Sequence, residues 1–394
     1  MAKKYLTAQE ASARLKVTAA TLYAYVSRGL IRSEAVSESK RVRRYLAEDV
    51  QKLLERKEHR SDPAKTAHAA LHWGTPVLDS ALTLITENGL YYRGYGVEFL
   101  VGARSFEQVA ALLWTGDFDR WQDSEPPVFP PDGLRAGRFL ANMQIALALS
   151  AEGDWGASAA RNPIAVGGRI LKVLTRAVAF PALPTGQIAD HVGAAWGVSP
   201  AAINAALILC ADHELNASSF AARIVASTGA SLYAAVASGL AALSGGNHGG
   251  HTARVAAMFR EIDTAHDHDG RSALIGERLA RGDGLPGFGH PLYPEGDPRA
   301  RCLLAYLEGN HASKRLTDDL TTLALLQRHI PDAPTIDCAL VIFERALNLP
   351  LGAAFALFAL GRAAGWIAHA LEQAATGTMI RPRATYTGVP PQEG

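Results

Sequence analysis

Cysteine is scarce in this chain, and the first residues lack the pattern of an export signal. Among 394 residues there are three cysteines, Cys210, Cys302 and Cys338. They are odd in number and lie far apart, without the paired spacing of zinc or redox sites. The opening residues, MAKKYLTAQE, contain two lysines but no apolar stretch of signal-peptide length. We therefore expect a cytoplasmic protein with reduced thiols and no metal site.

A membrane-spanning segment is not expected either. The most apolar run in the later part of the chain is residues 346–371, ALNLPLGAAFALFALGRAAGWIAHAL. Arg362 lies near the middle of this run, where insertion into a bilayer costs roughly 2.5 to 3.5 kcal/mol. Pro350 and Gly352 interrupt its beginning. We predict a buried helix that carries one functional arginine.

The chain has little net charge, but the charge is divided unevenly. The first 60 residues contain 14 basic and 7 acidic residues, whereas the remainder contains 25 and 31. A basic segment attracts polyanions, although it is equally compatible with a solvated surface. The length indicates two or three domains. With 48% hydrophobic and 20% charged residues, the composition is that of an ordinary globular protein.

Residues 1–57 show the signals of a small helix-turn-helix unit. The string TAQE at residues 7–10 has the spacing of a capping box and predicts a first short helix. Thr18 is placed to cap a second helix. Residues 31–45 end in basic residues that alternate with a valine, as in an exposed hairpin wing. Asp49 is placed to start a third helix.

Two strings in this unit, LTAQEASARLKVTAATLYAYVSRGLI and RRYLAEDV, are specific enough to carry a resemblance. The unit resembles the winged helix-turn-helix of the excisionase and mercury-regulator type. In that family the second helix enters the major groove and the wing touches backbone phosphates. The resemblance implies contacts to bases from Thr18, Thr21 and Tyr25, and contacts to phosphates from Arg41, Arg43 and Arg44. The alternative is a unit that packs on the rest of the protein, or mediates its assembly, without touching DNA.

Helical periodicity dominates the body of the chain, from residue 76 to residue 394. The segments with this periodicity are 106–113, 139–149, 203–210, 220–243, 318–328 and 336–347. Strand signals are scarce, and the clearest is a possible hairpin at residues 82–93 with its turn at Glu87-Asn88-Gly89. Residues 58–75 have few large apolar side chains and predict a linker. The body is therefore expected to be mainly α.

Three histidines in the body stand at helix edges or in glycine-rich turns. They are His213 in ADHELNAS, His248 in GGNHGG and His290 in LPGFGHP. The glycines around His248 remove side chains and let a substrate approach the backbone closely. A single histidine is more often a hydrogen-bonded structural residue, and glycine can simply mark a tight turn.

Several separated strings in the body occur in an order that favours a functional role for these histidines over a structural one. They are GLYYRGYGVEFL, SFEQVAALLWTGD, HELNASSFAARIVAST, SGGNHGGHTARV, PGFGHPLYPEGDPRA, TIDCAL, LGRAAGWIAHALEQ and IRPRATYTG. From about residue 76 to 388 the chain resembles citrate synthases. The resemblance implies an all-helical large domain of residues 76–248 and 346–394, and a small domain of residues 249–345.

The resemblance also implies a division of catalytic labour. The family's reaction needs a base for a weakly acidic proton of the thioester's methyl carbon, a group that stabilises the enol, and an acid for the ketone. By motif position, Asp337 is the base, His248 hydrogen-bonds the enol oxygen, and His290 polarises and protonates the oxo group of oxaloacetate. Such groups each contribute about 10² to 10⁴ to a rate. The alternative for Asp337 is a helix N-cap, because TIDCAL begins a helix.

Substrate-binding residues follow from the same motifs. The positions that match the family's ligands for oxaloacetate are His213, Arg299, Arg362 and Arg381. Guanidinium groups match carboxylates with two hydrogen bonds, although a salt bridge to a protein carboxylate is the other reading of each arginine. In citrate synthases the last of these arginines reaches into the neighbouring subunit, so the resemblance implies a homodimer or a larger assembly.

Coenzyme A is the second expected ligand, bound as a thioester substrate rather than as a permanent cofactor. The backbone of Leu285, Pro286, Gly287, Phe288 and Gly289 matches the loop that holds its adenine. The chain departs from the family after His290, where basic residues for the phosphates are often found and PLYPE stands here instead. This departure leaves the affinity for coenzyme A and the identity of the acyl group open.

The leading hypothesis is an acyl-CoA:2-oxo-dicarboxylate C-acyltransferase. It would condense acetyl-CoA or propionyl-CoA with oxaloacetate to citrate or 2-methylcitrate and free coenzyme A. The alternative is a transcription regulator whose synthase-like body senses a dicarboxylate or acyl-CoA without turnover. The three catalytic residues favour the enzyme, whereas the basic N-terminal unit and the missing basic residues favour the regulator. In a third reading the enzyme is active and its N-terminal unit serves assembly alone.

Overall fold

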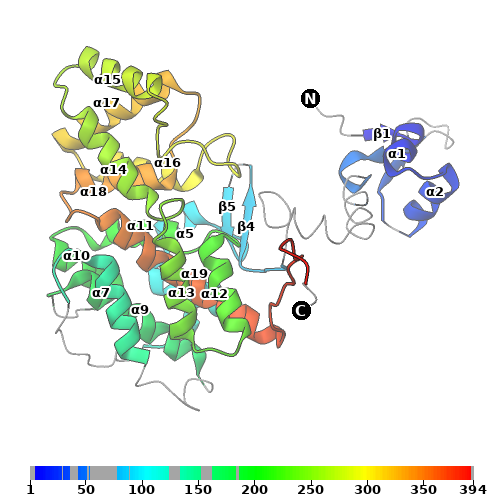
Figure 1. Cartoon of the computed structure of the whole chain (residues 1–394), viewed down its shortest axis with the longest axis horizontal. Helices are drawn as coiled ribbons and strands as arrows, with labels where there is room; N and C mark the ends of the chain where they lie inside the picture. The colour runs from blue at the N-terminus through cyan, green and yellow to red at the C-terminus, as the bar shows by residue number, and fades with distance from the viewer. Residues whose placement is uncertain are drawn as a thin grey trace. The chain divides into compact units, whose positions relative to one another are not determined.

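The computed structural model describes residues 5–28, 30–35, 43–50, 53, 78–87, 89–123, 134–151, 162–182 and 186–391. The chain forms two compact units, Met1–Asp79 and Ser80–Gly394. The first is coloured blue in Figure 1. Arg41, most of the predicted wing and the predicted linker lie outside the described residues.

The N-terminal unit combines two short helices with a three-stranded antiparallel sheet. Its elements are β1 (Tyr5–Thr7), α1 (Ala8–Leu15), α2 (Ala19–Ser27), β2 (Ser33–Ala35) and β3 (Arg43–Leu46), and the strand order is β1-β3-β2. The predicted capping box at Thr7 and Glu10 is present, and the side chain of Thr18 accepts the N–H of Thr21 at the start of α2. Strand β1 was not predicted.

A small apolar core holds this unit together, as the spacing of its residues predicts. Its fully buried members are Leu6, Ala11, Leu15, Leu22, Ile31, Tyr45 and Val50. The third helix begins at Ala47, two residues before the predicted start at Asp49. Asp49 lies inside the helix, and its carboxylate accepts three hydrogen bonds from the backbone and guanidinium of Arg32, at 2.8 to 2.9 Å.

The second unit begins with a small antiparallel sheet. Strands β4 (Thr83–Thr86) and β5 (Gly89–Tyr92) pair with Ile85 opposite Leu90, and a short β6 (Tyr95–Gly96) extends the sheet. The predicted hairpin is therefore confirmed, although residue 88 of its turn lies outside the described residues. The buried hydroxyl of Tyr92 bonds the carbonyls of Ile208 and Asp212 at 3.1 and 3.0 Å, which ties the sheet to the helices.

Helices make up most of the rest of the described part of this unit, so the mainly α prediction is confirmed. In order they are α5 (Val97–Ala103), α6 (Phe106–Thr115), the 3₁₀ helix η1 (Phe118–Arg120), α7 (Phe139–Ala151), α9 (Pro163–Ala179), α10 (Ile188–Trp196), α11 (Pro200–Cys210), α12 (Ala217–Ser227), α13 (Leu232–Leu243), α14 (His251–Ile262), α15 (His268–Ala280), α16 (Pro298–Asn310), α17 (Lys314–His329), α18 (Ile336–Ala346) and α19 (Ala353–Thr376).

One predicted helix is wrong, because residues 220–243 form two helices and not one. Gly229 adopts a positive φ of 81° after α12, and Ser231 then caps α13 by accepting the N–H of Ala234. Apolar periodicity continues across this break because both helices bury the same kind of face.

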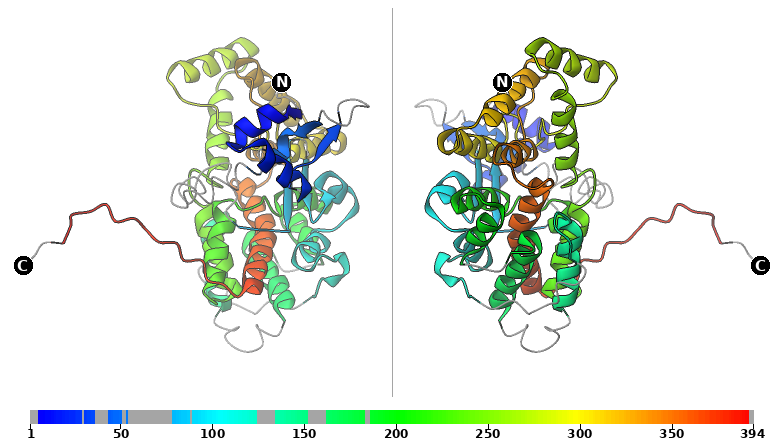
Figure 2. Two further views of the ribbon diagram at one scale, coloured as in Figure 1. Left: turned by 90° about the vertical axis from the view of Figure 1, so that its right-hand side faces the viewer. Right: turned by 90° about the vertical axis from the view of Figure 1, so that its left-hand side faces the viewer.

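Helix α19 is the buried axis of the second unit, and Figure 2 shows it surrounded by other helices in both views. Its length and apolar composition would suffice to cross a membrane, yet 89% of the apolar window is buried inside the protein. A Cβ at Gly361 would lie 2.7 Å from the carbonyl oxygen of Leu207, and one at Gly365 would lie 2.4 Å from Asp212 Oδ1. These glycines let α11 approach α19 closely, so the end of α11 lies beside Arg362.

Helices α14 to α18 gather at one end of this unit, and the others pack around α19 (Figure 1). The predicted small domain, residues 249–345, corresponds to that end. The division into large and small domains stays a prediction, because residues 80–394 form one compact unit.

Candidate active site

Five of the predicted site residues of the body stand at helix ends or in one buried helix. His213 follows α11, His248 stands in the turn before α14, and Asp337 is the second residue of α18. Arg299 lies in the first turn of α16, and Arg362 lies near the middle of α19. These are helix ends and one deeply buried helix, where side chains are held rigidly.

Tyr293 brings three of the predicted residues together. Its hydroxyl lies 2.9 Å from Nε2 of His213, and its ring centroid lies 5.1 Å from that of His290. The rings of His213 and His290 meet edge to face at 5.2 Å, and the guanidinium carbon of Arg299 lies 5.8 Å from the centroid of Tyr293. Tyr293 was not predicted as a site residue, although it stands three residues after His290.

Arg299 is paired inside the protein, as its alternative reading anticipated. Its guanidinium donates two hydrogen bonds to Asp297, at 2.9 and 2.8 Å, and both side chains are buried. Asp297 also accepts the N–H of Ile336 at 2.9 Å. This carboxylate therefore fixes the start of α16 against the start of α18. Burial opposes its charge, but Arg299 and the hydrogen bonds from the backbone together lower the pKa of Asp297.

Asp337 is a partly buried residue, and one oxygen of its carboxyl group is inaccessible to solvent. The N-cap of α18 is Thr335, so the alternative of Asp337 as a cap is wrong. Within the described part of the chain its Oδ1 has no hydrogen-bond partner. Burial raises its pKa to about 6, and Arg299 opposes this rise. A carboxyl group that titrates near neutral pH is suited to taking a proton from carbon.

His248 is hydrogen-bonded to the hydroxyl of Ser218, which has one proton and three polar neighbours. Ser218 Oγ lies 2.9 Å from His248 Nε2, accepts a bond from Trp366 Nε1 at 3.0 Å, and lies 2.7 Å from Asn216 Oδ1. Its proton serves either Asn216 or His248. The predicted role of His248 needs the second arrangement, because a neutral ring that accepts at Nε2 carries its proton on Nδ1 and can donate it there.

His290 is also a neutral donor at ordinary pH. The N–H of Leu292 donates to His290 Nδ1 at 3.2 Å, which leaves the ring proton on Nε2. Burial first and Arg299 second lower the pKa of His290 to about 4. Burial and Arg362 likewise lower the pKa of His248 to about 4. Both rings are therefore neutral at ordinary pH, and the one N–H of a neutral imidazole can donate a hydrogen bond to a substrate oxygen.

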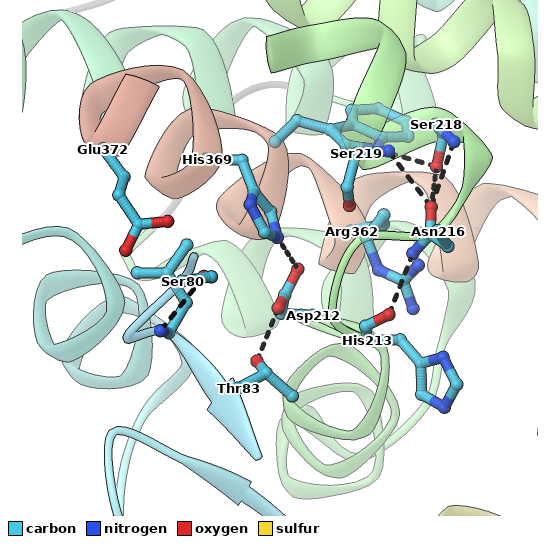
Figure 3. Close-up of polar contacts among 12 residues, drawn as sticks. Ser80, Thr83, Asp212, His213, Asn216, Ser218, Ser219, Arg362, His369 and Glu372 are labelled. Carbon is cyan, nitrogen blue, oxygen red and sulfur yellow. Dashed lines mark hydrogen bonds and ion pairs between the residues drawn. The ribbon is translucent and has the colours of Figure 1, made fainter. Parts of the chain in front are cut away.

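Arg362, drawn in Figure 3, is nearly inaccessible to solvent, and its guanidinium group is only partly hydrogen-bonded. Its Nε donates to the carbonyl of Cys210 at 2.9 Å, and its buried Nη2 has no partner among the residues that the structure describes. Burial lowers its pKa. The nearby carboxylate of Asp212 is engaged elsewhere, by Thr83 at 2.5 Å and His369 at 3.3 Å. A buried guanidinium in this state is suited to an anionic ligand.

Arg381 does not join the other predicted residues within one chain. It lies in an exposed segment, residues 377–391, which follows α19 and extends away from the helical body in Figure 2. The N–H of Ile380 donates to Ser227 Oγ at 3.0 Å and anchors the beginning of this segment on α12.

The predicted loop for coenzyme A lies against the approach to α18. The N–H of Thr335 donates to the carbonyl of Gly287 at 2.8 Å, and the N–H of Gly289 donates to that of Ala333 at 3.0 Å. Positive φ angles of 89° and 72° at the two glycines make the required turns. The loop is thus bonded to Thr335, which stands two residues before Asp337 in the sequence.

The predicted DNA-binding residues of the N-terminal unit differ in their exposure and in their contacts with other side chains. Thr18 and Arg43 are exposed, and the Thr18 and Thr21 hydroxyls bond each other at 3.0 Å. Tyr25 packs partly against the small core. Arg44 pairs with Glu34 at 3.0 Å and stacks on the ring of Tyr5. As for metals, the described residues contain no cluster of three or more side chains that could hold an ion.

Comparison with known proteins agrees with this geometry. A family model described as citrate synthase, C-terminal domain, matches residues 31–126 and 185–383, which is most of the chain. The chain belongs to the citrate synthase family. The match begins before residue 76, where the resemblance in the sequence analysis begins.

Several members of the citrate synthase family are similar over most of their length. A protein named putative citrate synthase 2 from Mycobacterium tuberculosis is 34% identical over 359 residues, which cover 80% of this chain and 94% of that protein. The 2-methylcitrate synthase of the same organism is 31% identical over 342 residues, 76% and 85% of the two chains. The solved citrate synthase from Thermotoga maritima has a TM-score of 0.66 and 25% identity, and covers 81% of this chain and 96% of that one.

A second similar structure is named as a complex with two ligands. It is the ternary complex of citrate synthase from Thermoplasma acidophilum with carboxymethyl coenzyme A and oxaloacetate, with a TM-score of 0.67 and 26% identity. The alignment covers 80% of this chain and 95% of that chain.

Proposed function

We propose that the chain condenses an acyl-CoA with oxaloacetate and releases free coenzyme A, as an acyltransferase of the citrate synthase type. The single observation that carries this proposal is the carboxyl group of Asp337, beside the loop at 285–289, with a pKa of about 6 and an inaccessible Oδ1 that has no hydrogen-bond partner among the described residues. The relatives named citrate and 2-methylcitrate synthase, and the complex with carboxymethyl coenzyme A and oxaloacetate, support it. They give no support to a regulator without turnover.

The reaction divides among three side chains. Asp337 takes a proton from the carbon next to the thioester carbonyl, and the Nδ1–H of His248 donates to the oxygen that becomes the enol. The enol carbon then attacks the 2-oxo carbon of oxaloacetate. His290 donates its Nε2 proton to the oxo oxygen as that oxygen becomes a hydroxyl. Water then hydrolyses the thioester and releases coenzyme A.

Oxaloacetate meets cations at both of its carboxylates. We assign Arg362, whose Nη2 has no partner among the described residues, and Arg299, with His213 as a further contact, to the site of one chain. Arg381 is assigned to the site of a partner subunit, since its segment is exposed and extends from its own helical body. The proposed unit is therefore a homodimer or a larger assembly in which two chains complete each site.

The acyl group is tested by measuring thiol release from acetyl-CoA and from propionyl-CoA, each with oxaloacetate. Faster release from acetyl-CoA assigns a citrate synthase, and faster release from propionyl-CoA assigns a 2-methylcitrate synthase. Release from neither substrate by full-length protein would overturn the proposed function and favour the regulator.

The pH dependence follows from Asp337. Its pKa is raised to about 6 and it acts as the carboxylate, so activity is present above about pH 6 and is lost as the pH falls through that value. We expect kcat/KM for the acyl-CoA to fall about tenfold per pH unit below pH 6. His248 and His290 stay neutral until about pH 4 and do not contribute to this limb. A flat profile down to about pH 5 would contradict the assignment of the base.

For the N-terminal unit we propose a winged helix-turn-helix domain of residues 1–57, joined by a linker of residues 58–75 to the body. Two capped helices and the antiparallel hairpin of β2 and β3 support this proposal. The domain would bind DNA through α2 and the wing, in a protein that remains an enzyme. The alternative is a role in assembly alone.

Arg43 and Arg44 provide a matched test of DNA binding. Arg43 is exposed, whereas Arg44 already pairs with Glu34 and Tyr5. We expect Arg43→Ala to weaken binding to mixed-sequence DNA and to reduce the slope of log affinity against log salt by about 1, with a smaller change for Arg44→Ala. Gel shifts at several salt concentrations measure both. Equal slopes for wild type and Arg43→Ala would argue for a unit that does not meet DNA through its wing.

A further inference from the structure

His251, the first residue of α14, contacts the loop assigned to coenzyme A. The backbone N–H of Gly287 donates a hydrogen bond to His251 Nε2 at 3.0 Å. His251 stands three residues after His248 in the string NHGGH, and the mechanism above does not use it. The bond joins α14, which begins beside the enol-stabilising histidine, to a loop 36 residues away in sequence.

Gly287 is held closely on its other sides as well. A Cβ at this position would lie 2.8 Å from Val255 Cγ2 and 3.1 Å from Cys338 Cβ. With the Thr335 N–H on its carbonyl oxygen at 2.8 Å, both polar groups of this residue are bonded. The loop therefore rests between α14 and the beginning of α18, and His251 supplies the contact from the α14 side.

This bond depends on the chemistry of the imidazole ring. A ring nitrogen accepts a hydrogen bond only when it carries no proton. Half-burial first and the nearby Arg254 second lower the pKa of His251, so the ring is neutral at ordinary pH. The neutral ring then carries its proton on Nδ1 and presents the bare Nε2 to Gly287.

The loop must keep its shape to bind a nucleotide through backbone groups. Residues 285–289 contain no ionisable side chain, and the residues after His290 are PLYPE, in place of cations that could bind phosphate. Affinity for the coenzyme then depends on where the loop's peptide groups point. A loop that loses one of its anchors has to be ordered on binding, which weakens affinity.

We propose that His251 is a positioning residue for acyl-CoA, which holds the loop at residues 285–289 in its binding conformation through the Gly287 N–H. This inference rests on the proposed function. It also adds a link between the coenzyme and the base, because the same glycine is bonded to Thr335, two residues before Asp337.

Three substitutions separate the hydrogen bond from the bulk of the ring. His251→Ala removes the acceptor at a helix position that suits alanine. His251→Gln places its amide oxygen at the same number of bonds from Cα as Nε2, and so can accept from Gly287. His251→Asn is equally polar, but its oxygen falls one bond short. All three are assayed at about pH 8, after thermal melting has confirmed folding.

We expect KM for the acyl-CoA to rise about tenfold in His251→Ala and in His251→Asn, and to return to within about threefold of wild type in His251→Gln. KM for oxaloacetate stays unchanged. Equal KM values for the alanine variant and wild type would overturn the proposal. So would the same loss in the glutamine and alanine variants, or parallel increases in both KM values.

Failure of the proposed function has a different signature. If wild type releases no thiol, that function fails, and the inference is then tested with coenzyme A alone as the probe in calorimetry. Weaker binding to His251→Ala than to His251→Gln supports the role of His251, and equal binding overturns it. If wild type releases thiol and all three variants have the kinetics of wild type, the proposed function is supported and the proposed role of His251 is overturned.

Discussion

Asp337→Asn is expected to lose at least about a hundredfold in turnover while oxaloacetate binding persists. The amide keeps the shape of the side chain but cannot accept a proton from carbon. Asp337 lies at the second position of α18 and does not cap the helix, so the helix should form unchanged. Turnover is measured as thiol release under saturating substrates, and binding as the shift of melting temperature that oxaloacetate causes.

A second aspartate controls for the change of charge. Asp269 is fully exposed in the first turn of α15, and Asp269→Asn should retain the turnover of wild type. Wild-type turnover in Asp337→Asn would sink the assignment of the base. Loss of the oxaloacetate shift together with turnover would point to a collapsed site instead of a missing base.

A mixture of two inactive variants is expected to recover roughly a quarter of wild-type activity. His248→Ala removes the enol partner and Arg381→Ala removes a carboxylate ligand, so each homodimer should be nearly inactive. If Arg381 serves the neighbouring subunit, a hybrid dimer has one site with both residues intact and one with neither. Random re-assortment makes half of the dimers hybrids, each with one working site.

The opposite geometry gives a clearly different result. Were Arg381 to act within its own chain, every hybrid site would lack one residue and mixing would recover nothing. Subunit exchange is verified by native mass spectrometry of the mixture. No recovery in a mixture that has exchanged would refute the shared site, and would require the exposed segment after α19 to fold back onto its own body.

Local signals in the sequence were the most predictive. The capping box at Thr7, the cap at Thr18 and the hairpin at residues 82–93 were found because each depends on residues a few positions apart. Strand β1 was missed, since three residues carry too little periodicity to be recognised. The break near Gly229 was missed for another reason: the apolar pattern continues through it.

Partners that are distant in sequence could not be found in this way. Ser218 bonds both His248 and Trp366 only because α12, α19 and the turn before α14 converge, and no local spacing encodes that. Asp297 is an intermediate case. It stands two residues before Arg299, so a capping aspartate that also pairs with an arginine could have been anticipated there. The roles of His213, His290 and Arg362 came from the resemblance, and the structure adds their burial and partners.

The pairing of Arg299 with Asp297 bears on which 2-oxo acids the enzyme can tell apart. Their charges cancel within the protein, so of the two arginines that we assign to the site of one chain, Arg362 is the one without an ion pair among the described residues. In the dimer that we propose, the second carboxylate then depends on Arg381 from the other chain. Discrimination between a 2-oxo dicarboxylate and a monocarboxylate such as pyruvate becomes a property of the assembled pair. It should therefore decline on dilution, as subunits separate.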